Sequence, residues 1–392
     1  MKKRLMVFTK YFKWLYKIYY YIGTVVINIF KIFVVPSDNI ILFNSFGGKK
    51  FDDSPKAIYD AMILDSRFDK YELVWAFHEP DKFDIPRGKK IKTDTIQYYK
   101  IALKARCWIS NSSIERGLNF KGKNTYYFNT FHGTPIKIMG TDINTKNKSF
   151  GTKNMESIVD NYTSQSKYEA DIFSRVFNTD RDKFLIYGLP RNDKLANYSK
   201  EEVDSIKRKL SIPFDKKIIL YAPTFREYER NSKLECVIDM PIDLTKWEKQ
   251  LGDKYIFLLR AHYEVAEVLN VKENSNFVYD VSDYKSLNDL MIISDLLISD
   301  YSSIFFDYSI MNKPMICYTY DYEKYSENRG MYFDIRDELE GGSLDENSLI
   351  DKIKNLNIKN NLEYVKTFRN KYVENYGNAT QLSLDKIYEN IK

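Results

Sequence analysis

Two series of short apolar runs, separated by stretches of helical composition, constrain the fold of this 392-residue chain more than any other feature. The first series occupies residues 40–43, 73–77, 107–109, 125–128 and 158–163, and the second occupies residues 218–221, 255–259, 277–279, 296–298 and 315–318. Apolar strands that alternate with helical stretches predict a parallel sheet with crossover helices. We therefore expect an α/β fold with one such sheet for each series.

The length of the chain also favours two domains, because one hydrophobic core rarely serves more than about 250 to 300 residues. With 44% hydrophobic residues the chain can fill two cores. A segment rich in turn residues, 187–193, separates the two series and suits a crossing between domains. We predict an arm at residues 1–36, a Rossmann-like domain at residues 37–193 and a second one at residues 194–392, with the two domains facing a central cleft.

Charge and cysteine content limit which partners, compartment and metal sites can be expected for the chain. The net charge of +6 comes from 60 Lys and Arg against 54 Asp and Glu, and the surplus is spread along the chain. Nucleic acid is therefore not an expected partner. Cys107, Cys236 and Cys317 stand far apart and are expected to be small core residues in a reducing compartment. With three histidines and no CxxC or HExxH motif, no metal site is predicted.

Residues 1–36 form a basic and aromatic arm whose second half is mostly apolar. This composition is typical of an amphipathic helix in the headgroup region of a membrane. A signal peptide and a spanning helix are alternatives, but Asn28 and Lys31 interrupt the apolar stretch and no small-residue cleavage site follows. A helix packed on the protein would give a similar pattern. We expect peripheral attachment to the cytoplasmic face of the membrane.

His132 is one of only three histidines, and it follows the apolar run at residues 125–128. Gly133, Thr134 and Pro135 come next and stop regular structure. His132 is thus expected at a strand end, where α/β proteins place ligands and chemistry. With a reference pKa of about 6.5, a histidine can accept a proton from an alcohol near neutral pH. The alternative is a strand-to-loop turn that contains a histidine by chance.

A turn at residues 45–49, with adjacent Gly47 and Gly48, follows the first predicted strand. It leads into a helix expected at residues 56–63, with Ser54 as N-cap and Pro55 in the first turn. Paired glycines could admit a phosphate group, but a plain turn is the simpler explanation.

Arg260 and His262 follow a strand of the second series. Being two apart on an extended segment, they would point the same way. A guanidinium fork and an imidazole donor together suit a phosphate oxygen. The alternative is structural, with Arg260 in an ion pair and His262 in a core hydrogen bond.

Two further turns of the second predicted sheet carry hydroxyl and charged side chains. The residues are Thr224 and Arg226 after the first strand of that series, and Asp300, Ser302 and Ser303 after the fourth. One of the two serines is expected as the N-cap of a helix, whose free amides could cradle a phosphate, although capping alone would explain both. Because these turns follow strands of one sheet, their side chains should converge at its carboxyl edge.

Five ordered segments closely resemble the signature blocks of the CDP-glycerol glycerophosphotransferases of wall teichoic acid synthesis. They are FHGTPIK at 131–137, GLPRND at 188–193, YAPTFR at 221–226, RAH at 260–262 and SDYSSIFFDY at 299–308. The resemblance implies a GT-B architecture that binds a CDP-activated polyol phosphate mostly through the second domain. It also implies that CMP is released as the polyol phosphate joins an acceptor hydroxyl.

The resemblance assigns residues as well. His132 matches the proposed general base, and His262 with Arg260 matches a pair that contacts the donor phosphates. The expected substrate contacts are Arg260, Asp300, Ser302, Ser303, Thr224, Arg226, Gly133 and Thr134. No cofactor is implied. The acceptors of the family, saccharides linked to a polyprenyl diphosphate, suit a membrane-attached arm.

The expected activity is therefore transfer of glycerol phosphate from CDP-glycerol to a lipid-linked saccharide or polyol-phosphate acceptor. Absence of paired carboxylates, a GxSxG elbow and a Walker loop counts against a hydrolase or a P-loop kinase. Three alternatives stay open: a CDP-ribitol or other CDP-polyol donor, a GT-B glycosyltransferase that uses a nucleotide sugar, and a membrane-bound scaffold without activity.

Overall fold

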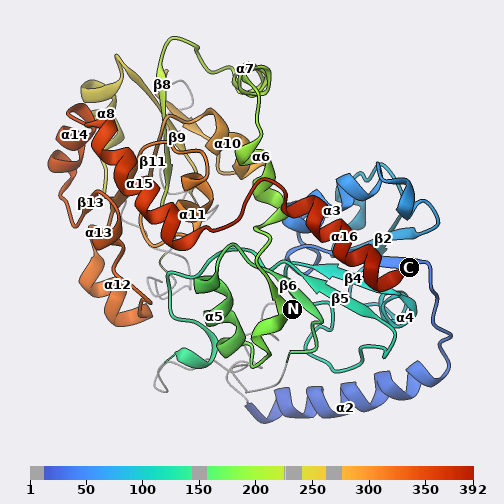
Figure 1. The fold of residues 1–392 in the computed structure, drawn as a ribbon. Helices are drawn as coiled ribbons and strands as arrows, with labels where there is room; N and C mark the ends of the chain where they lie inside the picture. Colours follow the sequence, from blue (N-terminus) through green and yellow to red (C-terminus); the bar gives the residue numbers. More distant parts are fainter. Residues whose placement is uncertain (1–12, 144–156, 225, 227–240, 262–275) are drawn as a thin grey trace. The chain divides into compact units, whose positions relative to one another are not determined.

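The computed structural model describes residues 13–143, 157–224, 226, 241–261 and 276–392. Contacts divide the chain into two compact units, each with its own sheet (Figure 1). The first unit is Met1–His132, Met139–Asp193 and Asn375–Lys392, and the second is Gly133–Ile138 and Lys194–Glu374. The predicted α/β class with two parallel sheets is confirmed, and each unit is described by itself.

The first unit is built on a seven-stranded sheet whose pairings are all parallel. Its strands are β1 (Ile40–Asn44), β2 (Glu72–Phe77), β3 (Lys89–Lys92), β4 (Cys107–Ser110), β5 (Tyr126–Asn129), β6 (Asn161–Thr163) and β7 (Phe184–Leu185). The order β3-β2-β1-β4-β5-β6-β7 places the first strand inside the sheet, as in Rossmann folds. Asn44 pairs with Ser110, so the turns after β1 and β4 leave the carboxyl edge side by side.

The second unit has a six-stranded parallel sheet with the same winding, in the order β10-β9-β8-β11-β12-β13. Its strands are β8 (Lys217–Ala222), β9 (Tyr255–Leu259), β10 (Val278–Asp280), β11 (Leu296–Ser299), β12 (Met315–Tyr318) and β13 (Gly341–Gly342). Ser299 pairs with Ala222, so β8 and β11 stand where β1 and β4 stand in the first sheet. Both units therefore have a switch point in strand order, where α/β proteins bind ligands.

Helices cover both sheets. Those of the first unit are α2 (Lys13–Ile32), α3 (Asp53–Met62), α4 (Ile96–Lys104), α5 (Lys167–Val176) and α16 (Ala379–Ile391), and α6 (Asp193–Ala196) begins at its last residue before the crossing. Those of the second are α7 (Lys200–Lys209), α8 (Leu244–Leu251), α10 (Leu287–Ile293), α11 (Ile304–Ser309), α12 (Tyr322–Arg329), α13 (Ile335–Glu338), α14 (Glu346–Lys354) and α15 (Ile358–Tyr372). Side-chain caps fix several starts: Thr95 accepts from the Tyr98 amide at α4, and Ser199 forms a capping box with Glu202 at α7.

The C-terminal helix α16 belongs to the first unit. Its residues Leu384, Ile387 and Ile391 are buried in the core beneath the first sheet, and α16 lies beside α3 (Figure 1). Asp193 caps the helix, accepting from the amides of Ala379 (2.9 Å) and Thr380 (2.7 Å). The predicted second domain extended to residue 392, whereas residues 375–392 return to the first unit because the apolar face of α16 is buried there.

All the predicted strands are present, but β3, β7 and β13 were missed. β3 is an edge strand in which only Ile91 is buried and the other three residues are exposed lysines. Pairing with β2, rather than apolar composition, makes it a strand. β7 and β13 have two residues each, which is too short for a periodic signal.

Helix α2 packs through its polar side on residues 116–121 of the first unit. Asn28 donates to the carbonyl of Asn119 (2.7 Å), and the Lys31 ammonium donates to the carbonyls of Phe120 and Lys121 (3.2 and 2.8 Å). None of the helices in the described part of the chain has the length and hydropathy that crossing a bilayer requires.

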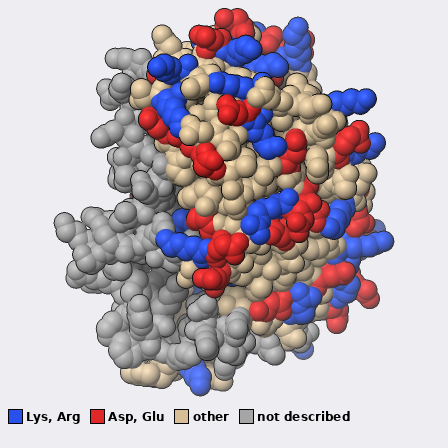
Figure 2. Space-filling model, turned by 90° about the vertical axis from the view of Figure 1, so that its left-hand side faces the viewer, with Lys and Arg blue, Asp and Glu red and all other residues tan. Residues whose placement is uncertain are grey.

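Charges of both signs are mixed over the face shown in Figure 2, with Lys and Arg beside Asp and Glu. Cys107 and Cys317 are buried, as predicted for core residues, and burial raises the pKa of both thiols. Cys236 lies outside the described residues.

Replacing Ile387 with Ala should loosen the first unit, although this residue is only five positions from the end of the sequence. A buried isoleucine cut back to alanine typically costs about 2 to 5 kcal/mol of stability. Hydrogen exchange should become faster in β1 and β2 and stay unchanged in β8 and β11. The half-exposed Ile358, at the start of α15, provides a matched Ile→Ala control with an effect within about 0.5 kcal/mol. Faster exchange confined to the second unit would contradict this assignment of α16.

Candidate active site

His132 lies two residues beyond Thr130, which directly follows β5, at the carboxyl edge of the first sheet as predicted. Its Nδ1 is 2.7 Å from the carbonyl oxygen of Asn111, in the turn after β4. A carbonyl only accepts, so Nδ1 carries the proton and Nε2 keeps its lone pair. None of the described residues bonds Nε2. The imidazole is therefore held as a neutral base.

Aromatic rings crowd the imidazole on two sides. The Phe131 ring stacks on it with centroids 4.1 Å apart, and the Phe46 ring lies at 5.6 Å. This crowding strips hydration from the charged form and lowers the pKa of His132, although the residue as a whole stays exposed. Asp53 opposes the shift and Arg191 adds to it. The neutral base thus persists to a lower pH than in an ordinary histidine.

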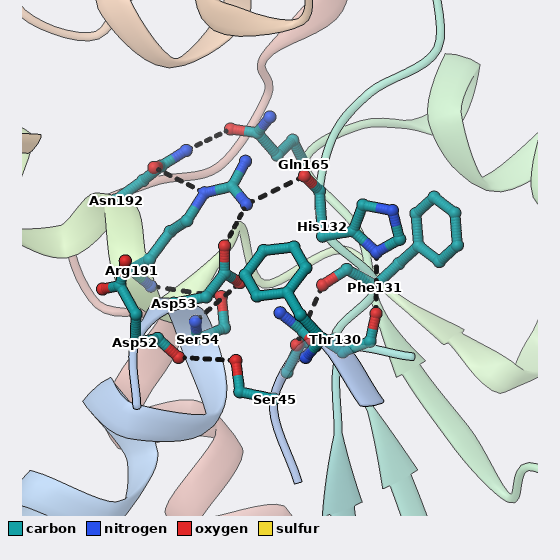
Figure 3. A network of polar contacts seen from close by, with 12 residues as sticks. Ser45, Asp52, Asp53, Ser54, Thr130, Phe131, His132, Gln165, Arg191 and Asn192 are labelled. Atoms are coloured by element: carbon teal, nitrogen blue, oxygen red, sulfur yellow. Dashed lines mark hydrogen bonds and ion pairs between the residues drawn. The ribbon is translucent and has the colours of Figure 1, made fainter. Parts of the chain in front are cut away.

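Arg191 connects His132 to the start of α3. Its NH1 nitrogen donates to the carbonyl oxygen of His132 at 3.0 Å and pairs with Asp53 Oδ2 at 2.7 Å, and Figure 3 shows the side chain reaching toward both. Next to it, Asn192 donates to Gln165 Oε1 (3.0 Å). Burial raises the pKa of the neighbouring Asp52; a hydrogen bond from the Asp53 backbone opposes this rise, and the charge of Asp53 adds to it. One carboxyl group, of Asp53, and one arginine, Arg191, therefore stand beside His132.

The GLPRND segment is explained largely by structural contacts. Gly188 has φ +87°, and a Cβ there would come within 2.5 Å of the Asn375 carbonyl oxygen, so only glycine fits. Arg191 and Asn192 lie in the polar network, and Asp193 caps α16. The segment joins the end of the first domain to the returning C-terminal helix.

The turn after β1 uses its own amides inside the protein. The amides of Phe46 and Gly47 donate to Asn111 Oδ1 and Ser112 Oγ, each at 2.8 Å, and that of Gly48 donates to the Ser45 carbonyl at 2.9 Å. This agrees with a plain turn rather than a phosphate cradle. The helix after it, α3, starts at Asp53 with Asp52 as N-cap, so the predicted cap at Ser54 was wrong.

Gly133 and Thr134 belong to a segment, Gly133–Ile138, that packs in the second unit. The Ile138 amide donates to the Gly330 carbonyl (3.1 Å), and the Tyr332 amide donates to the Ile136 carbonyl (2.8 Å). Thr134 is 2% exposed. Substrate contacts for these two residues stay predictions.

In the second unit, Arg226 and Asp300 form a buried ion pair at the switch point between β8 and β11. Their closest atoms are 2.9 Å apart, and both side chains are almost fully buried. Asp300 Oδ1 also accepts from the Thr224 amide (2.8 Å), so the two turns are joined as predicted for one carboxyl edge. Arg226 pairs with Asp321 as well, at 2.7 Å.

Three tyrosines surround the Arg226 guanidinium. The rings of Tyr301, Tyr320 and Tyr325 lie 4.9 to 5.3 Å from its central carbon. Burial opposes the charge, but Asp300 and Asp321 keep the pKa of Arg226 above its ordinary value. A guanidinium enclosed in this way supports the turn, which favours a structural role over direct contact with a substrate.

Ser302 and Ser303 differ in what their hydroxyls do. Ser302 Oγ accepts from the Ile304 amide at 3.3 Å, whereas Ser303 is the N-cap of α11 and makes no side-chain cap. Both are half-buried. Of the two, Ser303 has its hydroxyl unused by the described residues, so it is the better candidate for a ligand contact.

Arg260 lies at the end of β9, and its NH1 donates to three carbonyls of the segment after β10. These belong to Val281 (2.7 Å), Ser282 and Tyr284 (2.8 Å). Its guanidinium thus holds that segment in place. His262, the predicted partner of Arg260, lies outside the described residues. Their joint role as phosphate contacts stays a prediction.

Sequence reasoning missed the residues that hold His132. Asn111 and Asp53 each follow a strand that ends at the same carboxyl edge as β5, and that topology was the available signal. Arg191 stood in a quoted motif without any assigned role. The third histidine, His78, is in the same unit and lies 2.6 Å from Thr93 Oγ1 through Nδ1.

These two α/β units, each with a polar site at its switch point, are typical of enzymes that bind nucleotides at sheet edges. Residues 27–391 match the family model of CDP-glycerol:poly(glycerophosphate) glycerophosphotransferase. The chain belongs to this family.

Two curated relatives come from staphylococci. The teichoic acid poly(glycerol phosphate) polymerase of Staphylococcus epidermidis is 37% identical over 90% of this chain and 51% of its own length. The teichoic acid glycerol-phosphate transferase of Staphylococcus aureus is 36% identical over 84% of this chain and 87% of its own. The chain thus spans about half of the first relative and most of the second.

The wall teichoic acid polymerase TagF has a similar solved structure. It superposes with a TM-score of 0.82 at 35% identity, covering 91% of this chain and 90% of that one. A variant of TagF has also been solved after a soak with CDPG.

Activity should fall at acid pH with a midpoint below about 6.5, the ordinary histidine value. The predicted base, His132, must be neutral, and its pKa is lowered by crowding of the ring, so we expect protonation to remove activity only at lower pH. The measurement is the pH dependence of kcat/KM for CMP release from CDP-glycerol. A midpoint at or above 6.5 would contradict the lowered pKa of His132.

Proposed function

We propose that this chain transfers glycerol phosphate from CDP-glycerol to a hydroxyl of a lipid-linked saccharide or polyol-phosphate acceptor, in the synthesis of teichoic acid or a related cell-surface polymer. The observation that carries the proposal is the neutral His132, with its Nδ1 proton fixed by Asn111 and its Nε2 bonded by no residue in the described part of the chain, in a chain of this family. Such a base at a strand end suits activation of an alcohol.

In the proposed step, the acceptor hydroxyl gives its proton to Nε2 of His132. The acceptor oxygen then bonds to the phosphorus that carries glycerol. The bond from that phosphorus to the CMP oxygen breaks, and its electron pair leaves with CMP. The phosphate charge that develops needs donors, and Ser303 and Arg260 at the carboxyl edge of the second sheet, with His262, are the proposed sources.

The proposal takes the two Rossmann-like units as a GT-B enzyme, with the acceptor at the first sheet and the CDP-donor at the second. What supports it is the shared strand order of the sheets and the likeness to TagF. The donor soaked into TagF, CDPG, favours a CDP-polyol over a nucleotide sugar. No cofactor is proposed.

We further propose peripheral attachment to the cytoplasmic face of the membrane through α2. The helix turns Asn28 and Lys31 toward its own domain, so the side left outward is apolar. Side chains exposed on it by 46 to 60% are Trp14, Ile18, Tyr21, Ile22, Val25, Val26 and Ile29. Exposed apolar side chains at this spacing on one helix suit the boundary between headgroups and acyl chains.

His132→Ala should reduce CMP release from CDP-glycerol by about 100- to 10,000-fold, the usual value of general-base catalysis. The assay contains the full chain and a lipid-linked disaccharide. His78→Ala is the matched control, because His78 lies in the same unit and pairs with Thr93, and it should retain activity.

The same assay with CDP-ribitol or a nucleotide sugar in place of CDP-glycerol decides among donors. Unchanged turnover in His132→Ala would exclude this histidine as the base. The scaffold alternative would be favoured if no donor is turned over and if none of these donors raises the melting temperature of the chain. A bound ligand at about 100 times its Kd adds roughly 2.7 kcal/mol of stability.

The double variant Ile22→Glu, Ile29→Glu should bind vesicles that contain phosphatidylglycerol at least about tenfold more weakly than the unaltered chain. Each change removes an apolar side chain worth about 1.5 kcal/mol or more on burial and adds a repelled charge. Co-sedimentation measures the binding. Leu64→Glu, which alters a side chain 86% exposed elsewhere in the first unit, should leave binding unchanged. Equal binding by the double variant would contradict attachment through this face.

A further inference from the structure

We propose that Arg191 and Asp53 are positioning residues for His132, and that together they fix the orientation in which Nε2 faces an acceptor hydroxyl. The inference rests on the proposed function for the role of the base, whereas the geometry rests on contacts within the first unit.

One nitrogen of Arg191 serves two acceptors. NH1 is 2.7 Å from Asp53 Oδ2 and 3.0 Å from the carbonyl oxygen of His132. The Arg191 and Asp53 side chains are only 11% and 8% exposed, so water competes little for the pair. A charge-assisted bond shielded from water is short and directional, which makes Arg191 a rigid link between the start of α3 and the base.

His132 is consequently held from both ends. Its ring is fixed through Nδ1 by the Asn111 carbonyl, and its peptide is fixed through the carbonyl oxygen by Arg191. The first bond sets the tautomer and the second sets the peptide from which the ring projects. A displacement of about 1 Å at such a group can cost about 100-fold in rate.

The backbone on both sides of the Arg191 contacts is strained, and surrounding contacts must stabilise it. Phe131, directly before His132, has φ +46°, and Asp53 has φ +67°. Residues other than glycine rarely adopt these angles, and they persist where surrounding contacts over-determine them. The contacts of Arg191 with Asp53 and with the His132 carbonyl tie the two strained segments together.

The pair also balances charge at the base. Asp53 raises the pKa of His132 and Arg191 lowers it, and both are charged groups of the described residues that act on the ring. Asp52, next to Asp53, is the other carboxyl group of this network, and it faces Lys50 and Arg191. Removing the Arg191 charge should therefore raise the pKa of His132, because Asp53 remains. Removing the Asp53 charge should lower it, because Arg191 remains.

The first test reads His132 directly, by NMR of the full chain labelled with ¹⁵N-histidine. Only three histidines are present, and His132→Ala assigns the signal. We expect the Nδ1–H tautomer in the unaltered chain. Arg191→Met should raise the pKa of His132 and Asp53→Asn should lower it, with Asn chosen because it tolerates a positive φ. Titration and tautomer that are unchanged in both variants would overturn the proposal.

The second test separates a positioning role from a general loss of stability. Arg191→Met should lower kcat for CMP release by about 10- to 100-fold, with little change in KM for CDP-glycerol. In the His132→Ala background the same change should have no further effect, because Arg191 acts through the histidine. An equal further loss in that background would overturn the proposal.

Two variants serve as controls. Arg191→Lys keeps the positive charge but not the planar fork, so it should lower kcat without raising the pKa of His132, and it replaces Arg191→Met if that variant does not fold. Arg67→Met removes another arginine of the first unit, which pairs with Asp65 and Asp385 away from His132, and it should retain kcat. If the unaltered chain releases no CMP, the proposed function fails, while the NMR titration still decides whether the pair positions His132.

Discussion

Parallel pairing is the constraint on which the rest of this structure depends. In both sheets the first strand lies inside, and the chain winds outward from it on both sides. The turns that follow the parallel strands then all lie at the carboxyl edge of their sheet. At the switch point, between β1 and β4 or between β8 and β11, the connections that follow the two strands lead to opposite sides of the sheet. In the first unit this edge holds His132, Asn111 and the turn after β1. In the second it holds the turns of Arg226 and Asp300.

The two edges use their charged residues differently. Arg226 is enclosed by Asp300, Asp321 and tyrosine rings, so its guanidinium holds turns of the second unit together. Arg191 is also paired with a carboxylate, but it reaches the peptide of His132, whose Nε2 is bonded by none of the described residues. A buried pair that loses one member costs about 3 to 5 kcal/mol, so both are strong constraints on local geometry. Of these two pairs, the one in the first unit contacts a described histidine, His132, through Arg191.

Helix α2 shows how polar residues in an apolar segment can be misjudged from sequence. Asn28 and Lys31 counted against a membrane-spanning helix, and no helix among the described residues has the length and hydropathy to cross a bilayer. Their positive role is visible only in their contacts, because they bond the carbonyls of residues 119–121 and so determine which side of the helix is left outward. The polar side of α2 packs on its own domain, and the proposed membrane face is the apolar side that this packing leaves exposed.

Local composition by itself determined the strands with apolar runs, the α/β class and the position of His132 at a strand end, because these depend on short-range pattern. The edge strand β3, rich in lysine, was not predictable, since pairing with β2 creates it. The return of α16 to the first unit was decided by burial across more than 180 intervening residues, a contact that no local signal encodes.

The same distinction holds for the site. The sequence determined which side chain could act as a base, because histidine is the residue that exchanges a proton near neutral pH. Only the tertiary structure decided which of its nitrogens is available, through the carbonyl of Asn111, and which residues hold it, Arg191 and Asp53. Those partners are brought to His132 by the parallel sheet and the crossing segment from residues 21 to 79 positions away in the chain, and hydrogen bonds over such separations follow from topology rather than from neighbouring sequence.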